Sequence, residues 1–260
     1  MLSSLAPARR RLVVVLAAAL ALGVLISVGV ALLPSPAHPR RPVQQAVPGP
    51  LLLVPGYGGS VASLQPLASY LRAAGKDVSV VTLPGDALGD LDAQAVALGR
   101  AVSAALQRTG ASSVDIVGYS AGGVVARLYA RSHGGAAVAR RIVTLGAPQH
   151  GTQLAALGTL VPGSCPVACE QLAPGSVILT ALNAGDETPA GPLWESVWTT
   201  HDDVVIPADS ARLNGATNLT VQSLCPADSV DHTGLPRDPV VERIVAAALG
   251  VTQTLPPRGC

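Results

Sequence analysis

Short apolar runs along the chain alternate with segments whose apolar residues recur every three or four positions. The short runs predict buried strands at residues 51–54, 78–83, 114–117, 142–145, 193–199 and 219–224. The periodic segments predict helices at residues 61–74, 91–106, 177–182 and 240–249. Such alternation predicts an α/β fold, in which a mostly parallel sheet carries helices on both faces.

The first part of the chain has a different pattern. Arg9, Arg10 and Arg11 precede an uncharged apolar run at residues 12–33. A basic flank before an apolar run is typical of an export signal, and this run is also long enough to cross a bilayer. Because Ala37 follows as a small residue suited to cleavage, residues 1–37 are predicted to be either a signal peptide or a membrane anchor. Either way, the rest of the chain is expected outside the cell membrane, secreted or anchored to its outer face.

The remaining residues are predicted to form one domain after a linker. Residues 38–50 are rich in proline and arginine, which favours an extended linker. Residues 51–260 contain a single series of strands and helices, so we expect one domain, and a monomer. Residues 162–174 lack periodicity and are predicted to be an irregular excursion from it.

Composition excludes one class of partner. The formal net charge is +1, aromatic residues make up 2% of the chain, and basic residues are scattered. Nucleic-acid-binding proteins instead carry basic stripes and aromatic stacking platforms, so we expect no nucleic-acid partner.

The segment after the strand at residues 114–117 carries the first chemical signal. Gly118, Ser120 and Gly122 form a G-x-S-x-G pattern that leads from a strand into an apolar helical pattern. In a nucleophile elbow the serine occupies a strained turn, and its neighbours must be small so that strand and helix can approach. A phosphate-binding loop is disfavoured, because no Gly-Lys-Ser or Gly-Lys-Thr sequence follows.

Polar side chains follow other predicted strands as well. His201, Asp202 and Asp203 follow the strand at residues 193–199, and His232 lies beyond the last strand. Ligands of parallel sheets bind at the carboxyl ends of the strands, so these groups are expected near Ser120. The order serine, acid, histidine is that of the α/β-hydrolases.

The segments LVPGYGG, GYSAGG, LGAPQHGT, HDDVVIP and VDHTG together resemble the small triacylglycerol lipases of the α/β-hydrolase superfamily. The resemblance covers residues 51–249 and is greatest to lipases with little or no lid, both lid-poor bacterial lipases and the fungal lipase B type. It implies an α/β-hydrolase fold in which Ser120 is the nucleophile, Asp202 the acid and His232 the base. It also implies that the backbone N–H groups of Tyr57 and Ala121 form the oxyanion hole.

One position departs from the family pattern. Many bacterial relatives begin the oxyanion loop with His-Gly, whereas this chain has Pro55 and Gly56. Only backbone groups donate hydrogen bonds there, so the implied role of the loop is unchanged.

The motifs predict an exported serine ester hydrolase of the lipase or carboxylesterase type. It would act on an ester or lipid through an acyl-enzyme and would need no cofactor. If residues 12–33 are retained, they would contact the membrane. An acyltransferase with the same triad remains an alternative, and a non-catalytic binding protein is disfavoured because triad and glycine loops occur together. No metal is expected, because His201 and its neighbouring aspartates would point to opposite faces of a strand.

The four cysteines of the exported part make an even number, which favours disulfides over free thiols. Three pairings are possible. We choose Cys165 with Cys169, which would staple the irregular excursion. We also choose Cys225 with Cys260, because the lipases that the chain resembles carry a bridge near the histidine loop.

Overall fold

The computed structural model describes residues 43–252, 254 and 258–260. The predicted signal peptide or anchor at residues 1–37 lies outside this range, and so do the first residues of the predicted linker. Among the described residues, no helix combines the length and hydropathy needed to cross a membrane.

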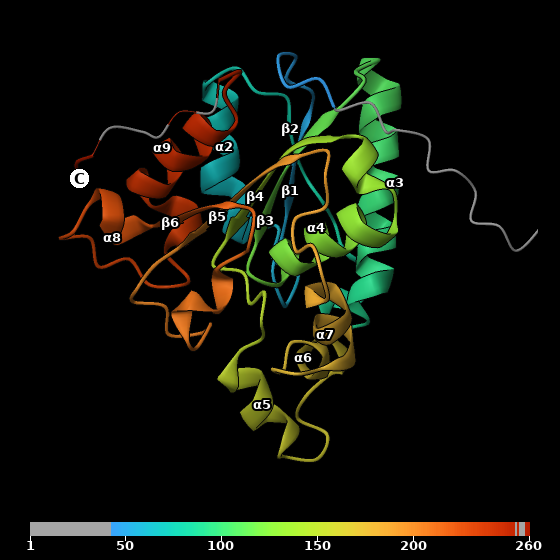
Figure 1. The fold of residues 1–260 in the computed structure, drawn as a ribbon, viewed down its shortest axis with the longest axis vertical. Coiled ribbons are helices and arrows are strands. Elements are labelled where there is room, and N and C mark those ends of the chain that lie inside the picture. The colour runs from blue at the N-terminus through green and yellow to red at the C-terminus, as the bar shows by residue number, and fades with distance from the viewer. Residues whose placement is uncertain (1–42, 253, 255–257) are drawn as a thin grey trace, which may run out of the picture. The chain divides into compact units, whose positions relative to one another are not determined.

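The centre of the domain is a six-stranded parallel sheet (Figure 1). The strands are β1 (Leu51–Val54), β2 (Val78–Val80), β3 (Val114–Tyr119), β4 (Ala139–Leu145), β5 (Leu193–Trp198) and β6 (Thr217–Thr220). Their order in the sheet is β2-β1-β3-β4-β5-β6. The predicted fold class is therefore confirmed.

Helices cover both faces of this sheet. On one face lie α2 (Gln65–Ala73) and α9 (Pro239–Ala248), and on the other lie α3 (Leu91–Thr109) and α4 (Ala121–Ser132) (Figure 1). Successive side chains of a strand point to opposite faces, and β1 follows this rule. Leu51 and Leu53 belong to the apolar core under α2 and α9, whereas Leu52 and Val54 belong to the core under α3 and α4.

Three short helices occupy the segment between β4 and β5. They are α5 (Gln153–Thr159), α6 (Val167–Gln171) and α7 (Val177–Asn183), and α5 extends beyond the sheet and its covering helices (Figure 1). The segment at residues 162–174, predicted to be irregular, thus contains α6. Short 3₁₀ helices lie at Ala62–Leu64, Pro84–Ala87, Gly135–Ala137, Ala208–Ala211 and Leu235–Arg237.

The predicted strand at residues 219–224 is wrong in its last four residues. The strand β6 ends at Thr220, and α8 (Val221–Leu224) follows at once. The Thr220 hydroxyl oxygen accepts a hydrogen bond from the backbone N–H of Ser223 at 3.1 Å, which caps the helix. Val221 and Leu224 are both buried. Residues three apart share one face of a helix but opposite faces of a strand, so burial of both side chains favours the helix.

A buried ion pair fixes the amino ends of β3 and β4. Arg140 donates to both carboxylate oxygens of Asp115, at 2.9 and 2.6 Å, and both side chains are almost fully buried. The same guanidinium donates to the carbonyls of Gln45, Leu249 and Gly250, at 2.8 to 3.0 Å. The described end of the predicted linker and the segment after α9 are therefore both bound to the sheet through Arg140.

The structure contains two disulfides, with the pairing chosen from the sequence. Cys165 is bonded to Cys169, and Cys225 to Cys260. No cysteine within the described ranges is free. The Cys225–Cys260 bridge holds the last residues against α8, where Gly259 N–H also donates to the carbonyl of Leu224 at 2.9 Å.

Replacing both Cys225 and Cys260 with serine is expected to lower the free energy of unfolding by about 3–4 kcal/mol, because the bridge closes a long loop in the unfolded chain. The sequence separation is 35 residues, against 4 for Cys165–Cys169. The matched control, serine at Cys165 and Cys169, should cost less, about 2 kcal/mol. Urea unfolding curves of the three proteins measure both losses. An equal or smaller loss for the Cys225 and Cys260 variant would contradict the prediction.

Candidate active site

Ser120 lies on a strained turn between β3 and α4. Its backbone has φ 52° and ψ −128°, in a region that side-chain-bearing residues seldom adopt. A Cβ atom on Gly118 would lie 2.5 Å from the carbonyl oxygen of Gly122, and one on Gly122 would overlap the carbonyls of Val54 and Pro55. Only glycine fits at both positions, so the G-x-S-x-G pattern follows from the tight approach of α4 to β1 and β3.

Three side chains from distant parts of the sequence meet at this turn. His232 Nε2 lies 3.0 Å from Ser120 Oγ, and His232 Nδ1 lies 2.8 Å from Asp202 Oδ2. All three side chains are largely buried. The structure therefore brings the predicted nucleophile, base and acid into one continuous chain of hydrogen bonds.

The turn after β5 determines which aspartate contacts His232. Asp202 Oδ1 accepts hydrogen bonds from the N–H groups of Val204 at 3.0 Å and Val205 at 2.7 Å. These bonds fix the carboxylate so that Oδ2 faces His232. The neighbouring Asp203 is exposed to solvent. Asp202 is thus the member of the pair that lies at the site.

Comparison with known proteins agrees with this architecture. A family model described as alpha/beta hydrolase fold matches residues 49–160, which include the elbow. The chain has the α/β-hydrolase fold. A search of curated proteins gives no match to this chain.

Solved structures of similar fold include two lipases. Lipase B of Aspergillus fumigatus superposes with a TM-score of 0.67 at 19% sequence identity, covering 84% of this chain and 56% of the lipase. The mature form of Bacillus licheniformis lipase BlEst2 superposes with a TM-score of 0.61 at 21% identity, covering 77% of this chain and 88% of the other. The chain therefore spans little more than half of the Aspergillus enzyme. The predicted resemblance to the α/β-hydrolase superfamily is confirmed.

Two residues that the sequence analysis did not select lie against the histidine of this site, Tyr119 by a direct contact and Gly146 by leaving room for it. The Tyr119 hydroxyl donates to the carbonyl of His232 at 3.1 Å, and the two rings lie 5.2 Å apart. Burial raises the pKa of Tyr119, so its hydroxyl stays protonated and remains a donor. At Gly146 (φ 54°), a Cβ atom would lie 3.1 Å from His232 Nδ1 and 3.2 Å from Asp202 Oδ2. The only signal in the sequence for this role of Gly146 was its position directly after β4, inside the LGAPQHGT motif.

The two predicted oxyanion-hole residues lie beside the serine. A Cβ atom on Gly56 would come within 2.8 Å of Ser120 Cβ, so the loop that carries Tyr57 passes directly against Ser120. Ala121 is the first residue of α4, where helix geometry supplies no acceptor for the backbone N–H. Both segments can therefore offer N–H groups to an oxygen atom near Ser120.

An apolar pocket of about 160 Å³ opens at Ser120. Its walls come from α5, from α6 and from the turn after Asp202, so the excursion between β4 and β5 builds much of it. The lining residues are Tyr57, Ser120, Pro148, Thr152, Leu154, Ala155, Cys169, Leu172, Val204 and Val205. None of them is charged, so the pocket suits an apolar group such as an acyl chain.

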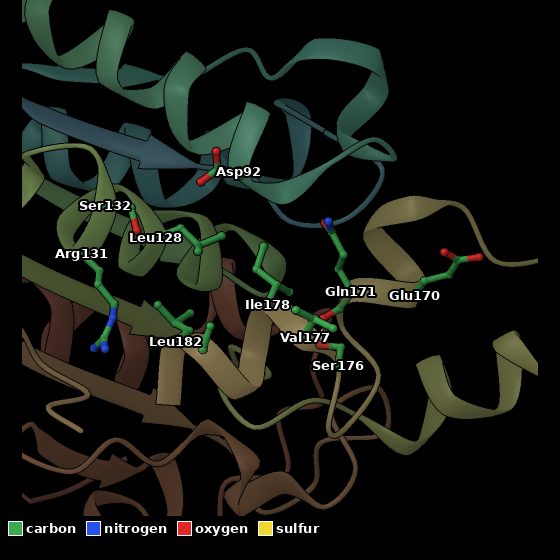
Figure 2. A pocket seen from close by; sticks show the side chains of 11 residues that line it. Asp92, Leu128, Arg131, Ser132, Glu170, Gln171, Ser176, Val177, Ile178 and Leu182 are labelled. Atoms are coloured by element: carbon green, nitrogen blue, oxygen red, sulfur yellow. Dashed lines mark hydrogen bonds between the residues drawn. The ribbon is translucent and has the colours of Figure 1, made fainter. Parts of the chain in front are cut away.

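A larger cavity, of about 530 Å³, lies away from the serine between α4, α6 and α7 (Figure 2). The apolar side chains of Leu128, Ile178 and Leu182 gather in it, with Asp92 and Arg131 nearby. Arg131 already donates to two backbone carbonyls, at 2.6 Å each. Its lining includes neither Ser120 nor His232 nor Asp202. The larger volume of this cavity therefore does not make it the reaction site.

The described residues hold no group of three histidine, cysteine, aspartate or glutamate side chains that could bind a metal ion. His201 points toward Gln222, whose side-chain nitrogen lies 3.4 Å from His201 Nδ1. It does not join His232 and Asp202.

Proposed function

We propose that this chain is an exported serine ester hydrolase of the lipase or carboxylesterase type. The observation that carries the proposal is the hydrogen-bond chain from Asp202 through His232 to Ser120, which ends at the mouth of an apolar pocket. In this arrangement Ser120 is the nucleophile, His232 the general base and Asp202 the acid that orients it.

Acylation begins when Ser120 Oγ attacks the carbonyl carbon of the ester and His232 Nε2 accepts its proton. The carbonyl oxygen becomes negatively charged, and the N–H groups of Tyr57 and Ala121 are positioned to stabilise it. When the tetrahedral intermediate collapses, the bond to the alcohol oxygen breaks. His232 Nε2 gives its proton to that oxygen, so the alcohol leaves neutral and the acyl group stays on Ser120.

Deacylation uses the same groups in the reverse direction. His232 accepts a proton from a water molecule as the water oxygen attacks the acyl carbon, and the proton then passes to Ser120 Oγ. The products are a carboxylic acid and the free serine. Asp202 stabilises the positively charged imidazole in both half-reactions and keeps Nδ1 protonated.

An exposed apolar surface beside the pocket supports lipid esters as substrates. Leu154, Leu157, Leu160 and Val161 are between 49% and 75% exposed, on α5 and directly after it. No charged residue occurs between His150 and Glu170. A cluster of apolar side chains that is exposed to water marks a surface that contacts another apolar surface. A lipid aggregate offers such a surface. Because Leu154 also lines the apolar pocket, this surface adjoins the pocket mouth.

The purified full chain is expected to hydrolyse p-nitrophenyl esters and to react covalently with a fluorophosphonate probe at Ser120. A series of esters from acetate to palmitate, measured at fixed enzyme concentration, gives the preferred acyl length. Mass spectrometry of peptides from the labelled protein gives the modified residue. Absence of turnover across the series, together with absence of labelling, would refute the proposed function.

We further propose that the domain works outside the cell membrane, either tethered by residues 12–33 or released after Ala37. Its two disulfides support this location, because such bonds persist in oxidising compartments. Cell fractionation is expected to place ester hydrolysis in the membrane or extracellular fraction. N-terminal sequencing of the active protein then separates the tethered form from the released one. Activity confined to the cytosol would contradict both forms.

A further inference from the structure

A second cavity, of about 340 Å³, adjoins the Ser120 site. Tyr57 lines both this cavity and the apolar pocket. Gly56, from the same loop, lines the second cavity. Two other lining residues are direct chain neighbours of the proposed catalytic groups, because Tyr119 precedes Ser120 and Thr233 follows His232. This second cavity therefore lies on the side of the site that carries His232.

The lining of the second cavity differs in chemistry from that of the apolar pocket. It includes the hydroxyl groups of Ser60, Ser63 and Thr233 and the charged side chain of Arg237, and it includes no aspartate or glutamate. The apolar pocket, in contrast, has no charged residue. The Ser63 hydroxyl donates to the carbonyl of Ser60 and the Thr233 hydroxyl to Asp231. The second cavity thus offers a ligand hydroxyl oxygens, the Ser60 hydroxyl as a donor, and one positive charge.

Arg237 is available to a ligand. It is exposed, and in the described part of the chain no carboxylate lies within 4 Å of its guanidinium. The nearby Asp231 uses its carboxylate inside its own turn, where it accepts from Thr233 Oγ1 at 2.9 Å and from Gly234 N–H at 2.7 Å. Those bonds are the main reason that the pKa of Asp231 is lowered, and the charge of Arg237 contributes less.

The proposed reaction determines which part of a substrate reaches each cavity. His232 must give its proton to the alcohol oxygen, so the alcohol part of the ester has to lie on the histidine side. The acyl part then enters the apolar pocket beside Ser120. The second cavity is therefore in place for the alcohol, and its volume accommodates a group as large as glycerol phosphate.

We propose, building on the proposed function, that the second cavity binds the alcohol part of the substrate and that Arg237 pairs with a phosphate group on that alcohol. A guanidinium presents parallel N–H donors that match two phosphate oxygens, which makes arginine suited to this contact. Because Arg237 is exposed, salt should weaken the interaction.

The test compares 1-butyrylglycerol with 1-butyrylglycerol 3-phosphate as substrates of the full chain. The two esters share the acyl group and differ only in the phosphate. We expect a lower KM for the phosphate ester, and Arg237→Gln should raise that KM about tenfold at low salt, the loss of one charge-assisted contact. The effect of Arg237→Gln on the neutral ester should be several-fold smaller, and 0.5 M NaCl should reduce the difference between the two esters. The matched control, Arg100→Gln on the exposed surface of α3, should change neither KM.

A binding measurement does not depend on turnover. Calorimetry with Ser120→Ala should detect glycerol 3-phosphate, and adding Arg237→Gln should weaken that binding about tenfold. Equal binding of inorganic phosphate would overturn the proposal, since it would show an anion site without recognition of the alcohol.

Two kinetic outcomes separate this proposal from the proposed function. Hydrolysis of the neutral ester without a lower KM for the phosphate ester, or equal effects of Arg237→Gln on both, would overturn the role of Arg237 and leave the hydrolase intact. Failure to hydrolyse either ester or any p-nitrophenyl ester would refute the hydrolase, and calorimetry would then decide on the phosphate site alone.

Discussion

Ser120→Ala is expected to lower kcat for ester hydrolysis by roughly 10⁴- to 10⁶-fold, because the nucleophile of a triad has no substitute. The hydroxyl oxygen lies 3.0 Å from His232 Nε2, and among the described residues no other hydroxyl is hydrogen-bonded to that nitrogen. Initial rates on p-nitrophenyl butyrate measure the loss. Circular dichroism and the thermal midpoint should stay close to those of the unchanged protein, since the substitution removes one oxygen atom.

The control for this experiment is Ser103→Ala on α3. Its hydroxyl donates only to the carbonyl of Gly99 within the same helix, at 2.9 Å. Full activity is expected. If Ser120→Ala kept more than a few per cent of the activity, Ser120 would not be the nucleophile.

Asp202→Asn is expected to lower kcat about 10⁴-fold, whereas Asp203→Asn should stay close to full activity. The reason lies in the turn that holds Asp202. The N–H groups of Val204 and Val205 require an acceptor at Oδ1, so an asparagine would place its oxygen there and its NH₂ group toward His232. His232 Nδ1 would then have to accept a hydrogen bond. The ring proton would move to Nε2, where the ring could no longer take the proton of Ser120.

The same pair of variants tests which aspartate is the acid. The measurement is kcat for each variant from pH 6 to 9, because a wrong tautomer lowers the rate across the whole range. A larger loss with Asp203→Asn than with Asp202→Asn would assign the acid to the exposed residue, against the geometry.

Strands and motifs were predictable because they depend on local patterns. The apolar runs located the first five strands, and the run at residues 219–224 overlapped β6 in two residues. The glycines around Ser120 identified the elbow, since their spacing reflects a steric need that the structure shows directly. The pairing of Asp202 rather than Asp203 with His232 came from the family resemblance. Periodicity alone does not distinguish two neighbouring carboxylates.

Other features depend on contacts between distant segments, which the sequence does not display. The role of Gly146 beside His232 and Asp202 arises only when β4, the acid turn and the histidine loop meet. The α8 helix was missed because four residues are too few to show a helical period. The short helices α5 and α6 were missed for the same reason, and their positions follow from packing and from the Cys165–Cys169 bridge.

The single guanidinium of Arg140 binds carbonyl groups from the segment before β1, at Gln45, and from the segment after α9, at Leu249 and Gly250. Arg140 and its partner Asp115 stand at the amino ends of β4 and β3, whereas Ser120 follows the carboxyl end of β3. The segment before β1 and the segment directly after α9 thus share one end of the sheet, and the proposed reaction occurs at the other, about 20 Å away for a strand of six residues. Attachment of the domain to a solid support through the segment that contains Gln45 would leave the mouth of the pocket facing the solution.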